Sequence, residues 1–306
     1  MTSNTEWLRG CATALITPFR TGGGVDAEAF RALVERQLEV GVKLLVPCGT
    51  TGESVTMTED ERLEVIKATI ELARGRARVI AGTGGNNTSA VIEHSRRAKE
   101  LGVDAVLIVA PYYNKPTQSG MYAHFRAVAD AVGELPIVIY NVPGRTSTNI
   151  SAETTLNLAR DVQNIVATKE ASGNLSQIMA ILRGRPADFR VLSGDDSLTL
   201  AMIALGADGL ISVASNEAPA LLARMVDTAL AGDWDTAREL HYRLLPLMEV
   251  NFIESSPGPV KAALAMMGLI EEVLRLPLVP IEETSRAQVR KVITELGLLK
   301  RRTQIQ

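Results

Sequence analysis

Short apolar runs rich in β-branched residues alternate with longer amphipathic stretches along the first 230 or so residues. Eight of these runs are almost continuously apolar, which is typical of strands that are covered on both faces in a parallel sheet. They are residues 11–19, 43–49, 77–83, 104–112, 136–142, 164–172, 189–196 and 208–215. Helical patterns lie between and after them at residues 27–40, 59–74, 89–101, 120–132, 152–160, 175–183, 197–205 and 218–231. The alternation therefore predicts eight consecutive βα units.

Eight βα units in this length match a (β/α)₈ TIM barrel, which typically takes ~250 residues. The alternative is a doubly wound open sheet, which usually carries a glycine-rich phosphate fingerprint at its first βα turn. Gly22-Gly23-Gly24 follows the first apolar run, but no GxGxxG motif with a distal acid accompanies it. We interpret it as a flexible turn and predict a catalytic (β/α)₈ barrel over residues 1–232.

The strand pattern stops at Asp233, and helical patterns take its place. They cover residues 234–252, 259–267, 270–274 and 282–299, with breaks marked by Pro257, Pro259, Pro277 and Pro280. This predicts a C-terminal helical domain over residues 233–306.

Several residues predict where helices begin and end. Thr58 with Glu61 has the spacing of a capping box, and Thr88 and Ser151 are further candidates for the N-cap. Gly41, Gly102 and Gly206 each stand at the end of a helical pattern, where glycine commonly closes a helix.

Composition and charge exclude several classes of protein. Aromatic residues make up only 4% of the chain against 46% hydrophobic residues, so the core must be mainly aliphatic. A net charge of −3 without a dense basic block argues against nucleic-acid binding. No apolar run approaches the ~20 residues of a membrane span, and the N-terminus resembles neither a signal nor a transit peptide. These features predict a cytoplasmic protein.

The cysteines and histidines do not form a metal-ligand pattern. Cys11 and Cys48 fall in or beside predicted strands, where we interpret them as small hydrophobic residues. His94, His124 and His241 lie far apart in helical patterns. We therefore expect neither a metal nor another cofactor.

The carboxyl ends of the predicted strands carry the polar residues that suit chemistry. Active sites of TIM barrels lie at this face. The residues concerned are Gly49–Glu53 after the second strand, Tyr112–Asn114 after the fourth, Tyr140, Asn141 and Arg145 at the fifth, Lys169 and Glu170 in the sixth, and Gly194–Asp196 after the seventh. Side chains from different strands are thus predicted to converge on one site.

Lys169 is the most informative of these residues, because it ends a run that is otherwise buried. Its stem could instead reach solvent, or its charge could pair with Glu170. A desolvated lysine has a lowered pKa, which leaves a neutral amine free to attack a ketone. The resulting iminium is an electron sink that activates the neighbouring carbon as a nucleophile.

Three further features suit a keto acid that is bound in this way. The Tyr140 phenol could move protons, although an isolated tyrosine is as often a core aromatic. The Gly49–Gly52 loop offers N–H groups and two hydroxyls to a carboxylate, where the alternative is an ordinary turn. Arg145 is a candidate second carboxylate clamp, or else a surface arginine. Residues 81–86 also suit an anion, but they lack the P-loop Gly-Lys-Ser/Thr of a nucleotide site.

At this point the chain resembles the dihydrodipicolinate synthase / N-acetylneuraminate lyase family. The matching segments are GTTGES at 49–54, YYNKP at 112–116, YNVPGRT at 140–146, KEASGN at 169–174, LSGDD at 192–196 and PVK at 259–261. Their order covers nearly the whole chain. The resemblance implies a pyruvate Schiff base on Lys169 and proton transfer by Tyr140.

The resemblance also implies roles for residues around this pair. Thr50 and Thr51 would hold the pyruvate carboxylate, and Thr50 would link Tyr140 to Tyr113, which reaches across a subunit interface. Gly194 and Ile211 match positions whose backbone lines the pyruvate pocket. A homotetramer is the assembly that the family implies.

Arg145 separates subgroups of the family. In the lysine-pathway synthases an arginine at this point binds the carboxylate of L-aspartate 4-semialdehyde, so the resemblance implies condensation of pyruvate with that aldehyde. The alternatives are another pyruvate-dependent class I aldolase, acting on 4-hydroxy-2-oxoglutarate or a sugar acid, and a keto-acid sensor without catalysis. The Lys169–Tyr140 pair argues against a sensor, since binding alone needs neither amine nor phenol. Residues 255–259 (SSPGP) depart from the Asn-Pro-Ile-Pro-like stretch that the family suggests.

Feedback inhibition by L-lysine is the last expectation that the resemblance raises. Sensitive members bind lysine at an interface near Tyr112 and Asn86, where this chain has Glu59, Arg62 and Ala90 at matching positions. Ala90 offers the ligand no hydrogen bond, and Arg62 repels its ammonium group. We therefore expect weak or no inhibition.

Overall fold

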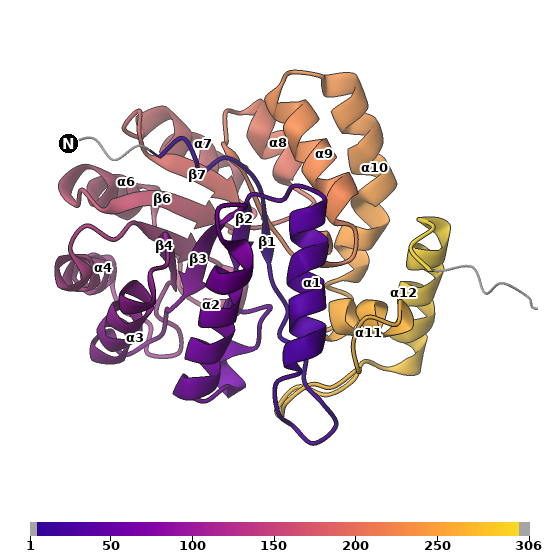
Figure 1. The fold of residues 1–306 in the computed structure, drawn as a ribbon. Helices are drawn as coiled ribbons and strands as arrows, with labels where there is room; N and C mark the ends of the chain where they lie inside the picture. Colours follow the sequence, from indigo (N-terminus) through magenta and orange to yellow (C-terminus); the bar gives the residue numbers. More distant parts are fainter. Residues whose placement is uncertain (1–4, 300–306) are drawn as a thin grey trace, which may run out of the picture.

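The computed structural model describes residues 5–299, so the ends of both predicted domains, residues 1–4 and 300–306, lie outside the described residues. Eight parallel strands form a closed barrel in sequence order (Figure 1). They are β1 (Gly10–Ala14), β2 (Leu44–Val46), β3 (Arg78–Gly82), β4 (Ala105–Val109), β5 (Ile137–Asn141), β6 (Ile165–Glu170), β7 (Arg190–Ser193) and β8 (Gly209–Ser212). The predicted TIM barrel is confirmed, and pairing of β1 with β8 closes it.

Helices follow the strands and surround the barrel (Figure 1). They are α1 (Ala27–Glu39), α2 (Glu59–Ala73), α3 (Thr88–Leu101), α4 (Gln118–Val132), α5 (Pro143–Thr146), α6 (Ala152–Asp161), α7 (Leu175–Gly184), α8 (Thr199–Ala204) and α9 (Pro219–Leu230). The short helix α5 and the 3₁₀ turns η1 (Ser54–Thr56) and η2 (Ala214–Asn216) were not predicted. They follow β5, β2 and β8, so Arg145 lies on a single helical turn rather than in an open loop.

Most of the predicted helix ends agree with the structure. Thr58 and Glu61 form the capping box of α2, and Ser151 caps α6. The prediction for Thr88 is wrong, because the N-cap of α3 is Asn87, whose side chain accepts from the N–H groups of Ser89 and Ala90. The Thr88 hydroxyl instead lies 3.0 Å from Nδ1 of His124. Gly41, Gly102 and Gly206 all have the positive φ expected of a glycine that ends a helix.

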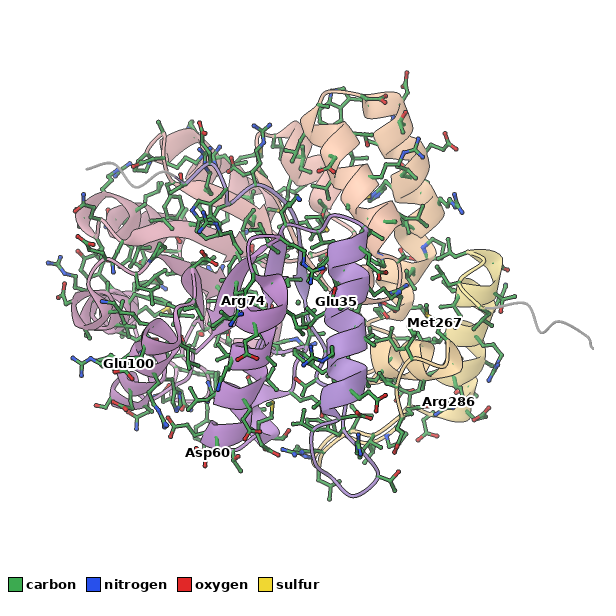
Figure 2. All side chains as sticks on the ribbon, in the orientation of Figure 1. Glu35, Asp60, Arg74, Glu100, Met267 and Arg286 are labelled. Atoms are coloured by element: carbon green, nitrogen blue, oxygen red, sulfur yellow. The ribbon has the colours of Figure 1, made fainter. Side chains whose placement is uncertain are left out.

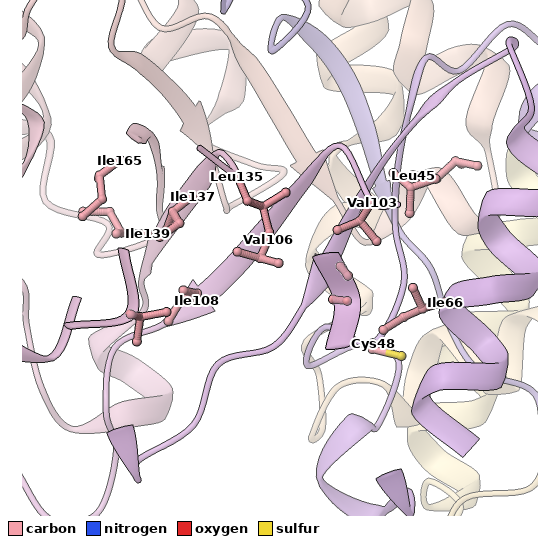
Figure 3. Packing of buried hydrophobic residues seen from close by; sticks show 14 of the residues in the cluster. Leu45, Cys48, Ile66, Val103, Val106, Ile108, Leu135, Ile137, Ile139 and Ile165 are labelled. Atoms are coloured by element: carbon pink, nitrogen blue, oxygen red, sulfur yellow. The ribbon is translucent and has the colours of Figure 1, made fainter. Parts of the chain in front are cut away.

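The core has two layers, which explains why the strands read as continuous apolar runs. Alternate strand residues such as Leu45, Val106 and Ile108 point outward and pack beneath the helices (Figure 3). Their neighbours, among them Leu44 and Leu107, fill the interior of the barrel. Because strand side chains alternate between the two faces, both sets must be apolar in a barrel that is covered by helices.

Three further helices follow the barrel: α10 (Trp234–Val250), α11 (Gly258–Met266) and α12 (Glu283–Glu295). Helix α10 packs against α9, and α12 contacts both α10 and α11 (Figure 1). The helix predicted for residues 270–274 is wrong, because residues 271–275 have no regular secondary structure. A helix of five residues is too short to be stable alone, and tertiary contacts bind this segment instead. The division into domains at residue 232 stays a prediction.

Three features of residues 5–299 bear on membrane-spanning helices, metal-ligand clusters and disulfide bonds. None of the helices within that range is both long and apolar enough to cross a membrane. Nor does the range bring together three or more His, Cys, Asp or Glu side chains that could hold a metal ion. Cys11 and Cys48 are buried free thiols, in β1 and directly after β2, as the sequence predicts.

Candidate active site

Lys169 and Tyr140 are partners in adjacent strands near the carboxyl end of the barrel. Their Cα atoms are in register between β6 and β5. Lys169 is 5% exposed, and its Nζ atom lies 4.2 Å from the centroid of the Tyr140 ring. The first alternative considered for Lys169, a stem that reaches solvent, is therefore wrong.

Burial sets the protonation of the Lys169 amine. The pKa of Lys169 is lowered from 10.5 to about 8, chiefly by desolvation; the charge of Asp196 opposes this shift, and that of Arg145 adds to it. A pKa near 8 leaves about one amine in ten neutral at pH 7. The side chain is thus prepared for nucleophilic attack without a base to deprotonate it.

Burial acts on the Tyr140 phenol in the opposite sense. Desolvation raises its pKa to about 12; Arg145 lowers it, while Asp195 and Glu170 raise it. At neutral pH the phenol therefore stays protonated beside a partly neutral amine. This pairing places a proton donor next to a nucleophile, which is the arrangement that carbonyl addition requires.

Tyr140 lines a cavity of about 180 Å³, whereas Lys169 is not among the residues that line it. It is lined by Gly49, Thr50, Ser54, Val55, Gly82, Gly84, Leu107, Val109, Tyr112, Tyr140, Val142, Arg145 and Thr146. The structure therefore brings together Thr50, Tyr140 and Arg145, which the sequence places far apart. The volume is below the ~300 Å³ at which drug-sized pockets begin, so it suits a small molecule.

The loop that carries Thr50 and Thr51 is held at both ends. Its first turn passes so close to Gly82 that a Cβ there would collide with the backbone of Cys48 and Gly49. At its far end the Thr17 hydroxyl donates to the carbonyl of Gly52 at 2.8 Å. Thr51 is buried, whereas Thr50 is exposed at the cavity.

Gly194 lies beside the lysine and Ile211 lies inside the barrel, but neither is among the residues that line the cavity, so their role in a pyruvate pocket stays a prediction. A Cβ atom at position 194 would lie 2.8 Å from Cβ of Ala171 and 3.0 Å from Cε of Lys169. Only glycine therefore leaves the Lys169 stem in place. Ile211 belongs to the inner core, together with Tyr140.

Arg145 and Tyr113 differ in their relation to the cavity. Arg145 lines the cavity, and its guanidinium donates to the carbonyl of Ser256 at 3.3 Å. The 255–259 segment, which differs from the stretch that the family suggests, therefore contacts a residue of the site. Tyr113 is 89% exposed, is absent from the cavity lining and has a left-handed backbone with φ 72°. This chain alone does not bring Tyr113 to Tyr140.

Two buried acids next to the site, Asp196 and Glu170, have contacts that the sequence does not predict. Asp196 accepts from the Ser212 hydroxyl and from the N–H of Val213, and its charge raises the pKa of Lys169. Glu170 accepts from Nδ2 of Asn141 at 3.1 Å and from the N–H of Ser172 at 2.8 Å. The sequence feature that could have pointed to these two residues is an acidic side chain at or just after the end of an apolar strand.

Comparisons with known proteins identify the family of this chain. The model of the Dihydrodipicolinate synthetase family matches residues 7–296. The chain is 55% identical over 297 residues to a 4-hydroxy-tetrahydrodipicolinate synthase of Koribacter versatilis (strain Ellin345), covering 97% of this chain and 98% of that relative.

Two solved structures are also similar to this chain. The first is a dihydrodipicolinate synthase from Aquifex aeolicus, with a TM-score of 0.93 and 46% identity over 96% of this chain and 99% of that one. The second is a chloride-inhibited dihydrodipicolinate synthase from Acinetobacter baumannii complexed with pyruvate. Its TM-score is 0.93 with 42% identity over 95% of this chain and 99% of that one.

Proposed function

The chain belongs to the dihydrodipicolinate synthetase family, and from that premise we propose that it condenses pyruvate with L-aspartate 4-semialdehyde, as a 4-hydroxy-tetrahydrodipicolinate synthase. The observation that carries the proposal is the buried Lys169 amine, with a pKa of about 8, over the ring of Tyr140. An unreactive structural lysine would not need a desolvated position at the end of a barrel strand.

The chemistry begins with the neutral Lys169 amine. Its lone pair attacks C2 of pyruvate, and Tyr140 delivers a proton to the carbonyl oxygen. The carbinolamine loses this oxygen as water and becomes an iminium ion. Loss of a proton from C3 then gives an enamine, whose C3 attacks the aldehyde carbon of the second substrate. Hydrolysis or cyclisation of the product frees the amine.

Thr50 and Thr51 are the groups that we assign to the pyruvate carboxylate. Thr50 lines the small cavity, and Thr51 follows it in the same loop as a buried residue. Hydrogen bonds from the threonine hydroxyls to a carboxylate are charge-assisted and therefore stronger than neutral ones. Gly194 and Ile211 complete the pocket around the lysine.

Arg145 is the group that we assign to the carboxylate of the aldehyde substrate. It lines the cavity and lowers the pKa of both Tyr140 and Lys169, so its positive charge is felt at the reacting atoms. A guanidinium suits planar recognition of a carboxylate. A substrate without a second carboxylate would leave this charge unpaired.

We also propose that Tyr113 acts in a neighbouring subunit of a homotetramer. Tyr113 is 89% exposed, and Val55 at the cavity is 80% exposed. Large exposed side chains of this kind beside a functional pocket are typical of an interface. In the assembly, the phenol of Tyr113 would reach Thr50 and Tyr140 of the partner and complete a path for protons.

The experiment that tests the proposal compares second substrates at saturating pyruvate. We expect turnover with L-aspartate 4-semialdehyde, followed in an assay that consumes the condensation product, and little cleavage of 4-hydroxy-2-oxoglutarate or of sugar acids. Preferred turnover of either of the latter would assign the chain to another pyruvate-dependent aldolase activity. Saturable pyruvate binding without any turnover would support a sensor.

A further inference from the structure

Glu53 and Lys261 form an ion pair whose two side chains are both 0% exposed. Glu53 closes the loop that carries Thr50 and Thr51, whereas Lys261 lies on α11, more than 200 residues later. The pair therefore joins the loop to the C-terminal helices. The chemistry proposed above uses neither residue.

The surroundings of the pair are charged and ordered. The Lys261 ammonium also donates to the carbonyl of Val273 at 2.9 Å, and it lies 4.2 Å from the centroid of the Phe19 ring. The backbone N–H of Arg275 donates to Oε2 of Glu53 at 3.2 Å. Both oxygens of the Glu53 carboxylate are thus bound by groups from the C-terminal region.

Arg275 continues the connection to the barrel. Its guanidinium pairs with both oxygens of Glu61, at 2.5 and 2.7 Å, and donates to the carbonyls of Gly23 and Thr56. These bonds account for the irregular course of residues 271–275, which run beside the loop after β1 (Figure 1). The segment holds η1 and the start of α2 in place from one side.

The backbone conformation of Glu53 shows that the loop depends on this anchor. Glu53 has φ 53° and ψ 32°, a left-handed conformation that side chains other than glycine and asparagine rarely adopt. Its N–H donates to the carbonyl of Thr50 at 3.1 Å. A conformation of this kind persists only where surrounding contacts fix it, and here the carboxylate provides them.

We propose that the Glu53–Lys261 pair is a positioning device for the pyruvate site, which sets the Thr50 and Thr51 hydroxyls against the substrate carboxylate. The inference rests on the proposed function, because it assigns the carboxylate to that loop. It gives the C-terminal helices a part in substrate binding. Neither residue touches the substrate, so both are positioning residues.

An ion pair suits this purpose better than apolar packing does. Replacement of a buried pair by hydrophobic side chains often leaves stability unchanged, whereas removal of one partner strands a charge. Two oxygens with fixed donors also define a direction, which methyl groups do not. Stability and loop position can therefore be separated by mutation.

Three variants make that separation: Glu53→Gln, Lys261→Met and the double substitution. Each is nearly isosteric. The single variants leave a buried charge without its partner, and both Tm and pyruvate binding should suffer. The double variant removes both charges, so its Tm should recover while the loop stays unanchored.

The matched control is Arg286→Met, which breaks the ion pair between Arg286 and Glu272 at 2.5 Å within the C-terminal region. Arg286 on α12 lies far from Asp60 at the start of α2 (Figure 2). This variant loosens the 271–275 segment at Glu272 but leaves the Glu53–Lys261 ion pair itself intact. We expect a lower Tm and unchanged pyruvate binding.

The measurement is the rate of borohydride-dependent labelling as a function of pyruvate concentration, together with Tm and steady-state constants. We expect the half-saturating pyruvate concentration to rise about tenfold or more in the single and the double variants, the scale of one charge-assisted hydrogen bond. The kcat at saturating pyruvate and the KM for the aldehyde should change by less than about threefold.

The outcomes separate this inference from the proposed function. Recovery of both Tm and pyruvate binding in the double variant would show that the pair acts through stability alone, and unchanged binding in the single variants would overturn the proposal outright. Wild-type protein that takes up no label at all would instead refute the Schiff base, and the positioning role with it.

Discussion

The Nζ atom of Lys169 lies 4.2 Å from the centroid of the Tyr140 ring, across the in-register pair of β6 and β5. The amine sits over the aromatic face, where the ring quadrupole attracts a cation. The same burial lowers the pKa of the amine to about 8 and raises that of the phenol to about 12. The two groups thus have protonation states suited to opposite tasks.

Tyr140→Phe should lower kcat by roughly 10²- to 10⁴-fold, the usual range for a lost acid–base group. The variant keeps the aromatic ring over Lys169 but lacks the phenolic proton. The pyruvate adduct should still form, more slowly, and this can be followed by trapping with borohydride. Unchanged turnover would remove Tyr140 from the mechanism.

The rate of imine formation should follow the ionisation of Lys169. Below pH 8 the neutral fraction increases about tenfold for each pH unit, and it levels off above the pKa of about 8. We therefore expect the initial trapping rate at low pyruvate concentration to rise with pH and reach a plateau above pH 8. A rate that is flat between pH 6 and pH 9 would show that the free amine is not limiting.

Arg145→Ala should impair use of the aldehyde far more than binding of pyruvate. One charge-assisted contact contributes about 1.5–3 kcal/mol, which corresponds to roughly a 10- to 100-fold loss in kcat/KM for L-aspartate 4-semialdehyde. Because Arg145 also lowers the pKa of Lys169, the pH profile of trapping should move to higher pH. Equal losses for both substrates, or for neither, would favour a sugar-acid aldolase.

The barrel and most of the site could be predicted because both follow from local patterns. Apolar runs that are buried on both faces identify the strands, and the carboxyl-end rule then brings Lys169, Tyr140 and Thr50 to one face. Contacts between distant segments leave no such pattern. No helix forms at residues 270–274. The Val273 carbonyl instead accepts from Lys261, and Arg275 beside it bonds to Glu53 and Glu61.

The position of Tyr113 shows a second limit. Its motif is recognisable, but within this chain its side chain is exposed and its backbone conformation is left-handed. Contacts with another subunit depend on surface residues, and the alternation of strands and helices does not predict them. The sequence places both Asp195 and Asp196 after the seventh strand, but it does not indicate that Asp196 is the buried one of the two.

Feedback inhibition by L-lysine should be weak. At the positions that the family resemblance indicates, Glu59 is already paired with Arg97 at 2.5 Å, and Arg62 lies 3.4 Å from the His94 ring. A lysine ammonium would therefore meet two arginines and no free carboxylate from Glu59. Titration of L-lysine at saturating pyruvate checks this. Half-inhibition below about 10 mM, ten times an upper-range KM of ~1 mM, would show that the pocket works.

The central claim is that Lys169 carries the substrate as a Schiff base. The direct measurement treats the protein with pyruvate and borohydride and maps the modified peptide by mass spectrometry, with Lys169→Ala as the matched control. We expect one pyruvate-derived adduct, on Lys169, which is absent from a Lys169→Ala variant that still folds. An unmodified Lys169 together with a label on Lys115 or Lys261 would contradict it.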